Sequence, residues 1–271
     1  MTIFYFSATG NNLYVAKSLG GKTYSIPQLL KETKRTFSDD KIGLVLPVYY
    51  FTVPPYIQDF LNQVTLKTPY LFAILTYGMF SGTAATWLQN WAKRKGQAFA
   101  YLNHIQMVDN YLPGFDMQKQ MDTEPHKHIE DKIAAVKADL DQNVHFVRQD
   151  SPFMHLFGRL IAPASSPKND QVSSRYQEGF EHRFTVDEHC VGCGICAKVC
   201  PASNIQMQEN RPHYTDHCVA CLACTQNCPH QAIRMKGEKN DVRFRNQHVS
   251  LADLIDANNQ AAPGHKPKVA E

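Results

Sequence analysis

Residues 190–201 read CVGCGICAKVCP, and residues 218–229 read CVACLACTQNCP. Both stretches have the spacing C-x2-C-x2-C-x3-C-P, so the second repeats the first. All eight cysteines of the chain lie in these two stretches, and residues 1–189 contain none. A disulfide framework would distribute its cysteines through a small secreted chain. Cysteines packed two residues apart indicate a metal centre in a reducing compartment instead.

Three thiolates at this spacing can curl around one iron–sulfur cubane and bind three of its irons. The fourth cysteine, which precedes a proline, points away and reaches the other cluster. The repeat therefore predicts two [4Fe–4S] clusters whose ligands cross between the two runs. The first predicted ligand set is Cys190, Cys193, Cys196 and Cys228. The second predicted set is Cys218, Cys221, Cys224 and Cys200.

Zinc is the main alternative for closely spaced cysteines. A zinc site uses two C-x2-C pairs separated by a longer loop, and it has no use for a third cysteine or a trailing Cys-Pro. Over about residues 181–237 the block resembles the bacterial ferredoxin with two [4Fe–4S] clusters. That resemblance implies a small α+β domain that carries single electrons.

The first 150 residues alternate between strand-like and helix-like patterns. Apolar and β-branched runs predict strands at 3–6, 42–48 and 70–76, with 98–107 expected as a fifth strand. Apolar spacing of three and four predicts helices at 13–19, 56–64 and 83–95, and a longer one over 129–147. Alternating strands and helices are typical of a doubly wound α/β fold with a parallel sheet. Its ligands bind beyond the carboxyl ends of the strands.

The loop after the first predicted strand is rich in hydroxyl and amide side chains. It reads SATGNN and opens a predicted helix. Such a loop can hold a phosphate monoester with backbone N–H groups and hydroxyls, without a lysine. Helix N-caps also favour these residue types, so an ordinary cap is the alternative. The candidate phosphate-binding residues are Ser7, Thr9, Gly10, Asn11 and Asn12.

Two further loops place aromatic residues at the ends of predicted strands. An isoalloxazine ring needs aromatic walls and backbone amides at its polar edge, although core packing explains either loop taken singly. Three such loops at one edge of the sheet favour a flavin mononucleotide (FMN) site. The candidates after 42–48 are Pro47, Tyr49, Tyr50 and Phe51. Those after 70–76 are Thr76, Tyr77, Gly78 and Gly82.

The SATGNN loop resembles the phosphate loop of flavodoxins. The order of the two halves is similar to that of a known family of fused flavodoxin–ferredoxin proteins. The resemblance implies a flavodoxin-like doubly wound parallel sheet, followed by a ferredoxin domain with two iron–sulfur clusters. Asn12 departs from the family by standing where a hydroxyl residue is usual. Residues 50–52 are bulkier than the glycine-containing loop common there. Residues 110–113 are also expected near the flavin.

The organisation expected from these patterns has four parts. Residues 1–150 form the FMN-binding domain, 151–180 a connector that docks on one domain, and 181–237 the ferredoxin domain. Residues 238–271 carry a helix capped by Ser250 over 251–255 and a mobile tail. The formal net charge is only +3, and no cluster of Lys and Arg points to nucleic acid. No secretory signal and no membrane span is expected, so the predicted location is the cytoplasm.

Electron transfer is the leading functional hypothesis. Clusters exchange one electron each, whereas a flavin accepts one or two, and the protein sets potentials and distances. No G-x-G-x-x-G follows the first strand, so electrons are expected from a redox partner protein rather than from nicotinamide. The alternative is an FMN-dependent reductase of a small molecule fed by its own ferredoxin domain. A redox sensor or assembly partner with an empty flavin site is a third hypothesis.

Overall fold

The computed structural model describes residues 1–33, 35–151 and 179–261. Its first half is built on a six-stranded parallel sheet with the order β2-β1-β4-β6-β7-β8. The strands are β1 (Thr2–Tyr5), β2 (Lys22–Ser25), β4 (Lys41–Pro47), β6 (Tyr70–Tyr77), β7 (Tyr101–Gln106) and β8 (Phe146–Val147). β3 (Thr36–Ser38) and β5 (Thr65–Lys67) pair separately. Without the short β8, the main sheet has the flavodoxin strand order 2-1-3-4-5.

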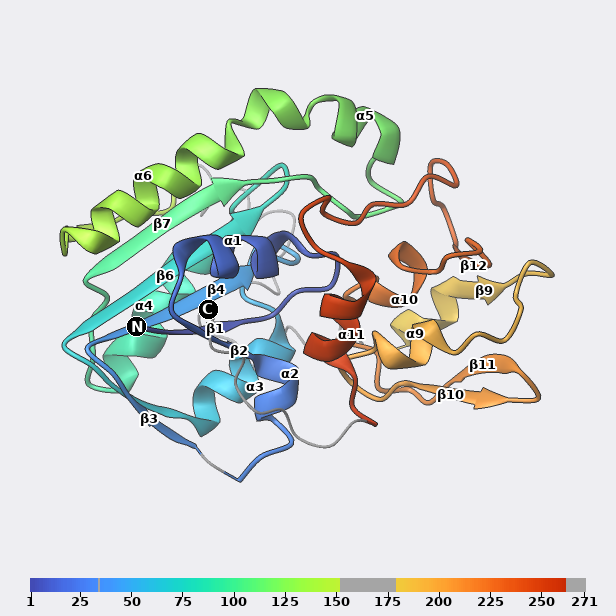
Figure 1. The fold of residues 1–271 in the computed structure, drawn as a ribbon, viewed down its shortest axis with the longest axis horizontal. Coiled ribbons are helices and arrows are strands. Elements are labelled where there is room, and N and C mark those ends of the chain that lie inside the picture. Colours follow the sequence, from blue (N-terminus) through green and yellow to red (C-terminus); the bar gives the residue numbers. More distant parts are fainter. Residues whose placement is uncertain (34, 152–178, 262–271) are drawn as a thin grey trace.

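Helices cover both faces of this sheet (Figure 1). Because successive side chains of a strand point to opposite faces, β1 contributes to two cores. Ile3 and Tyr5 pack with α1 (Asn11–Leu19) and α6 (Ile129–Asp141). Phe4 and the following Phe6 pack with α3 (Pro55–Gln63) and α4 (Ala84–Arg94). Shorter helices are α2 (Ile26–Leu29), α5 (Met117–Asp122) and the 3-10 helix η1 (Glu124–Lys127).

The second half is a small domain built from two similar halves, each with a short helix. α9 (Ile195–Lys198) and α10 (Ala223–Gln226) contact each other. β9 (Phe184–Val186) pairs with β12 (Ile233–Met235), and β10 (Ile205–Gln208) pairs with β11 (Arg211–Tyr214), both antiparallel. The 3-10 helix η3 (Phe180–Arg183) leads into β9. The parallel sheet of the first half and this small domain together confirm the predicted fold class.

The C-terminal segment turns back onto the first half. Its helix α11 (Leu251–Asn258) has a capping box formed by Ser250 and Asp253, and it contacts both α2 and α9. Lys17 of α1 forms a 2.8 Å ion pair with Asp253. Figure 1 shows α11 lying between the sheet half and the domain that carries α9 and α10. The predicted mobile tail, as far as it covers 262–271, lies outside the described residues, as do residues 152–178 of the predicted connector.

Several predicted elements differ from the observed ones. The helix expected over 129–147 ends at Asp141, because Asn143 has a left-handed φ of 54°. The chain then pairs beside β7 as β8, so Val147 belongs to a strand. The fifth strand begins at Tyr101 rather than at residue 98. β2 was given no position by the sequence pattern, and β8 falls within the helix expected over 129–147. Within the described residues, none of the helices is long and apolar enough to cross a membrane.

Candidate flavin and iron–sulfur site

A cavity of about 370 Å³ lies where β1, β4, β6 and β7 end. This is the edge at which ligands of doubly wound sheets bind. Nearly all the predicted flavin-binding residues line it: Ser7, Thr9, Asn11, Asn12, Pro47, Tyr49, Tyr50, Phe51, Thr76, Tyr77 and Gly78. Gly10 and Gly82 were also predicted to bind the flavin, but neither lines the cavity.

The predicted phosphate loop is buried at the start of α1. Gly10 has a φ of 102°, and its N–H donates to Ser7 Oγ at 3.1 Å. Thr9 Oγ1 accepts from Asn110 Nδ2 at 2.7 Å, which leaves the Thr9 hydroxyl hydrogen available for a ligand. The N–H groups of the first turn of α1 offer a favourable position for an anion. The loop therefore has the donors that a phosphate monoester requires.

Asn12 and Thr76 connect the phosphate loop to the sheet. Asn12 Nδ2 donates to Phe6 O at 2.7 Å, and Asn12 Oδ1 accepts from Thr76 Oγ1 at 2.6 Å. Both side chains are buried. The Asn12 amide therefore fixes the loop relative to β6, a role that a hydroxyl residue at this position is too short to fill.

Three consecutive carbonyls of the phosphate loop accept hydrogen bonds from distant parts of the chain. Asn258 Nδ2 donates to Ser7 O at 3.0 Å, and Asn227 Nδ2 donates to Ala8 O at 3.0 Å. The Asn246 N–H donates to Thr9 O at 2.8 Å. We refer to these three contacts as the carbonyl clamp. The clamp holds the carbonyls away from the cavity, where an anion would repel them.

Glycine at position 10 allows the segment that carries Asn246 to approach closely. A Cβ atom at Gly10 would lie 2.9 Å from Asn246 Cβ and 3.0 Å from Val249 Cβ. The positive φ of Gly10 also favours glycine. Sequence patterns identified Gly10 as part of the loop, but they gave no sign of the segment that packs against it.

The loop after β4 is a tight hairpin made by two aromatic residues. Tyr49 and Thr52 exchange backbone hydrogen bonds of 3.0 Å each. Tyr50 and Phe51 between them have φ angles of 48° and 66°. Left-handed backbone at bulky residues is strained and is found where function or packing requires it. The hairpin directs aromatic side chains to the cavity wall, as a flavin ring would need.

Gly82 holds this hairpin in place from behind. A Cβ atom at Gly82 would lie only 2.0 Å from Phe51 O. The Thr83 N–H donates to the same carbonyl at 2.7 Å. Gly82 thus allows the loops after β4 and β6 to approach closely, and it shapes the cavity indirectly.

Asp109 is a cavity residue that the sequence analysis missed. Burial raises the pKa of its carboxyl group, while N–H donors from Tyr111 and Met79 and the charge of Lys127 oppose that rise. Asp109 Oδ2 accepts from the Met79 N–H at 3.1 Å. A Cβ atom at Gly78 would lie 2.0 Å from the same oxygen. Gly78 therefore allows a carboxylate to reach the wall of the cavity.

The first predicted cluster set surrounds one small cavity of the second domain. Its lining includes Cys190, Cys193, Cys196 and Cys228. Burial raises the pKa of Cys196 to about 12, and the charges of the other three thiols add to the rise. Without iron the Cys196 thiol stays protonated, whereas a bound metal displaces the proton. Cys193 is exposed, so this set lies near the surface.

The second predicted set is deeper. Burial raises the pKa of Cys218 to about 12, and the charge of Cys200 adds to the rise. Burial raises the pKa of Cys221 further, and Cys200 and Cys218 contribute. The Asn204 N–H lies 3.3 Å from Cys200 Sγ, and the Ala220 N–H lies 3.4 Å from Cys218 Sγ. Such N–H donors tune the potential of a cluster.

The backbone between the ligands curls in the same way in both runs. Gly192 and Gly194 each have a φ of 71°, and the matching Ala220 and Leu222 have φ angles of 54° and 63°. One left-handed residue in each gap between the first three cysteines of a run turns N–H groups toward the sulfurs. Four thiols in each set, with backbone donors around them, fit the ligand requirement of a [4Fe–4S] cluster.

The flavin cavity and the second cysteine set share a wall. Ala220, Cys221 and Leu222 line the cavity together with the aromatic loops. Tyr49 lies on the same wall; burial raises its pKa well above the ordinary value, with a smaller contribution from Cys221. A cluster held by Cys221 would therefore adjoin the bound ring.

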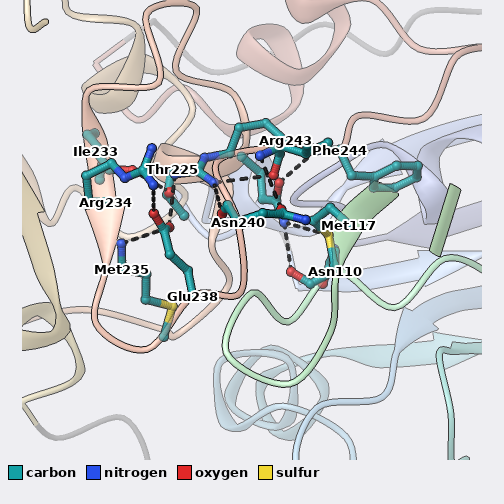
Figure 2. Close-up of polar contacts among 12 residues, drawn as sticks. Asn110, Met117, Thr225, Ile233, Arg234, Met235, Glu238, Asn240, Arg243 and Phe244 are labelled. Carbon is teal, nitrogen blue, oxygen red and sulfur yellow. Dashed lines mark hydrogen bonds and ion pairs between the residues drawn. The ribbon is translucent and has the colours of Figure 1, made fainter. Parts of the chain in front are cut away.

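Polar contacts fix the two halves around this wall. Gln226 Nε2 donates to Asn110 O at 2.8 Å, and Gln226 Oε1 accepts from the Phe244 N–H at 2.8 Å. Figure 2 shows Asn110 and Phe244 in this network beside Arg243 and Glu238. Arg243 and Glu238 form a buried 3.0 Å ion pair. Gln226 of α10 thus bonds both to Asn110 in the first half and to Phe244 in the C-terminal segment.

Comparisons with known proteins agree with this description. Residues 189–233 match the family model of the 4Fe-4S dicluster domain. No curated protein sequence matches the chain.

Three solved structures show limited similarity. A putative flavoprotein from Bacteroides uniformis is 17% identical over 44% of this chain and 94% of its own, with a TM-score of 0.31. Rubredoxin oxygen:oxidoreductase from Desulfovibrio gigas is 15% identical over 51% of this chain and 36% of its own, with a TM-score of 0.28. An FMN-dependent NADH-azoreductase from Bacillus anthracis, in complex with FMN, is 10% identical over 50% of this chain and 99% of its own, with a TM-score of 0.30.

The fold of the first half is identified from its strand order and not from these structures. That order is the flavodoxin one. The matched family model covers the repeated cysteine runs. The chain therefore joins a flavodoxin-like α/β domain to a 4Fe-4S dicluster domain, the arrangement of a flavodoxin–ferredoxin fusion.

Proposed function

We propose that this protein transfers single electrons between a redox partner protein, two [4Fe–4S] clusters and one FMN. The observation that carries the proposal is the shared wall, where Cys221 of the second cysteine set lines the flavin cavity. An electron on that cluster would reach the ring without crossing the body of either domain. Accumulating single electrons on a flavin is chemistry that the cofactors supply and the protein positions.

The positions of the two cysteine sets give the route a direction in space. Cys221 and Cys224 are buried, whereas Cys193 is exposed and the neighbouring Val191 is 62% exposed. A partner protein can approach the first set more closely than the second, in which Cys200, Cys221 and Cys224 are buried. We therefore assign the first cluster to exchange with the partner and the second to exchange with the flavin.

FMN is the proposed flavin because of the closed phosphate loop. Ser7, Thr9 and Asn12 are almost fully buried, and the carbonyl clamp lies behind them. This pocket accommodates a terminal phosphate. The adenosine part of a larger flavin cofactor would have to pass through the clamp.

The volume of the cavity favours a carrier over a small-molecule reductase. Pockets for cofactors and ligands span roughly 300 to 1,000 Å³, and this cavity is about 370 Å³. A flavin ring would fill most of it. A substrate would have to lie beside the ring, near Met79 and Phe80, two lining residues that are exposed. The free cysteines also favour a reducing compartment, for which we propose the cytoplasm.

Anaerobic purification followed by rapid kinetics tests this proposal. We expect about one FMN and roughly eight iron atoms per chain. A reduced one-electron donor protein should reduce the clusters before the flavin. Cys193→Ser should remove the first cluster and slow flavin reduction by that donor, while FMN content is retained. His189→Ala, beside the same ligand set, serves as the control. Flavin reduction at an unchanged rate in Cys193→Ser would refute the route.

A further inference from the structure

Glu181 carries a buried carboxylate, and no ion pair to it is found among the described residues. It is 3% exposed, and its Oε2 atom has no hydrogen-bond partner among the described residues. An ionised carboxylate in such a place is strongly unfavourable unless a cation or a hydrogen-bond donor compensates it. The flavin cavity and the cysteine sets do not include Glu181, so those sites do not explain it.

Two further metal-binding side chains lie beside Glu181. One ligand atom each from Glu181, His182 and Asp216 lies within 4.8 Å of the others. Glu181 and His182 belong to η3, which leads into β9, whereas Asp216 lies in the loop before Cys218. Asp216 has a left-handed φ of 59°. Segments far apart in sequence thus bring two carboxylates and an imidazole together.

The surroundings make the local charge more negative still. Asp216 precedes the predicted cluster ligand Cys218 by two residues. Thiolates that hold a cluster would add to the negative charge. His182 and Asp216 are exposed, so an ion could enter from solvent and keep bound water. A cation at this point would compensate both carboxylates.

We propose that Glu181, His182 and Asp216 bind one divalent transition-metal ion beside the second cysteine set. One imidazole nitrogen with two carboxylates suits Mn²⁺, Fe²⁺ or Zn²⁺, whereas Ca²⁺ and Mg²⁺ prefer oxygen ligands alone. The ion ties the start of the second domain to the loop that carries Cys218. This site is separate from the proposed electron route and does not depend on it.

Manganese binding to the anaerobically purified holoprotein tests the site. After treatment with a chelator too weak to remove the clusters, Mn²⁺ is titrated and the free ion is followed by EPR. We expect one Mn²⁺ per chain, displaced by Zn²⁺. His182→Ala and Asp216→Asn should each weaken binding by more than about tenfold, since even residues that only support a ligand cost that much. The control is His128→Ala with Asp131→Asn, an exposed His–Asp pair at 3.5 Å.

A second measurement locates the ion. Bound Mn²⁺, unlike Zn²⁺, should raise the microwave power that half-saturates the EPR signal of the reduced clusters. Glu181→Gln distinguishes an ion from a proton. If Glu181 binds the metal, this variant weakens Mn²⁺ binding; if it holds only a proton, Mn²⁺ binding is unchanged and the proposal fails. The absence of stoichiometric Mn²⁺ in the wild type, or equal loss in the control pair, would also overturn it.

Discussion

Removing one donor of the carbonyl clamp should weaken binding of FMN much more than binding of riboflavin. Asn258→Leu keeps the approximate size of the side chain and deletes its 3.0 Å hydrogen bond to Ser7 O. Ser7 is 3% exposed, so water cannot easily replace the lost donor. The freed carbonyl can turn toward the phosphate, and the loop loses the conformation that presents its N–H groups.

The structure sets the size of this effect. An unsatisfied buried polar group costs about 1 to 3 kcal/mol, and we take about 1 to 2 kcal/mol because the loop can partly relax. At 1.4 kcal/mol for each factor of ten, the Kd for FMN should rise about five- to thirtyfold. Asn227→Leu removes the donor to Ala8 O and should have an effect of similar size. Riboflavin has no phosphate, so its Kd should change by less than about twofold.

Flavin fluorescence titration of cluster-loaded protein measures both constants. Asn259→Ala is a matched control, because its side chain accepts from the Ala261 N–H and makes no contact with the loop. Iron content checks that the clusters remain. An equal loss of FMN and riboflavin affinity would mean that Asn258 supports the fold generally. The carbonyl clamp would then have no specific role in phosphate binding.

Three further outcomes follow from other contacts. Gly82→Ala should lower the FMN content of purified protein several-fold, because its Cβ would lie 2.0 Å from Phe51 O. The absorbance of the flavin after desalting measures this content. Full FMN occupancy would contradict the packing argument. Cys228→Ser should abolish the EPR signal of the first cluster and leave the second, whereas loss of the second alone would reverse the ligand assignment. Burial, then Arg148, lowers the pKa of His104 from 6.5 to about 4. Its neutral form therefore stabilises the fold above pH 6.5, and that contribution, up to about 3 kcal/mol, is lost as pH falls toward 4. In His104→Gln, the free energy of unfolding measured with urea should therefore vary less between about pH 4 and 6.5 than in the wild type. An unchanged pH dependence would contradict this prediction.

Local sequence signals predict the two cysteine sets, and they single out loops whose residues line one cavity of the structure. The cluster ligands are encoded by the spacing of cysteines within a few residues, and the loops by polar or aromatic runs at the ends of strands. Gly10 and Gly82 were predicted to bind the flavin; neither lines the cavity, and both allow other segments to pack closely. A glycine in a loop indicates a special conformation or a close approach, and sequence alone does not say to what.

Long-range contacts account for most of what sequence reasoning missed. Asn227 and Asn258 contact loop residues 219 and 251 positions away, and no periodicity or motif marks them. Asp109 follows a strand as many loop carboxylates do, and only its fit against Gly78 distinguishes it. β8 was read as helix because apolar residues continue at helical spacing past Asp141, where a left-handed Asn143 ends the helix.

The two halves of the chain contact each other at two places along the cavity, and these contacts affect how electrons would move. Cys221 lines the cavity beside the aromatic loops, while Asn227, next to the predicted ligand Cys228, donates to Ala8 O in the predicted phosphate loop. Domains on a flexible tether would have to find each other for every transfer, and the rate would follow that search. A docked interface with buried polar contacts keeps one distance between cluster and ring. The step that depends on diffusion is then confined to the exposed end near Cys193, where a partner protein arrives.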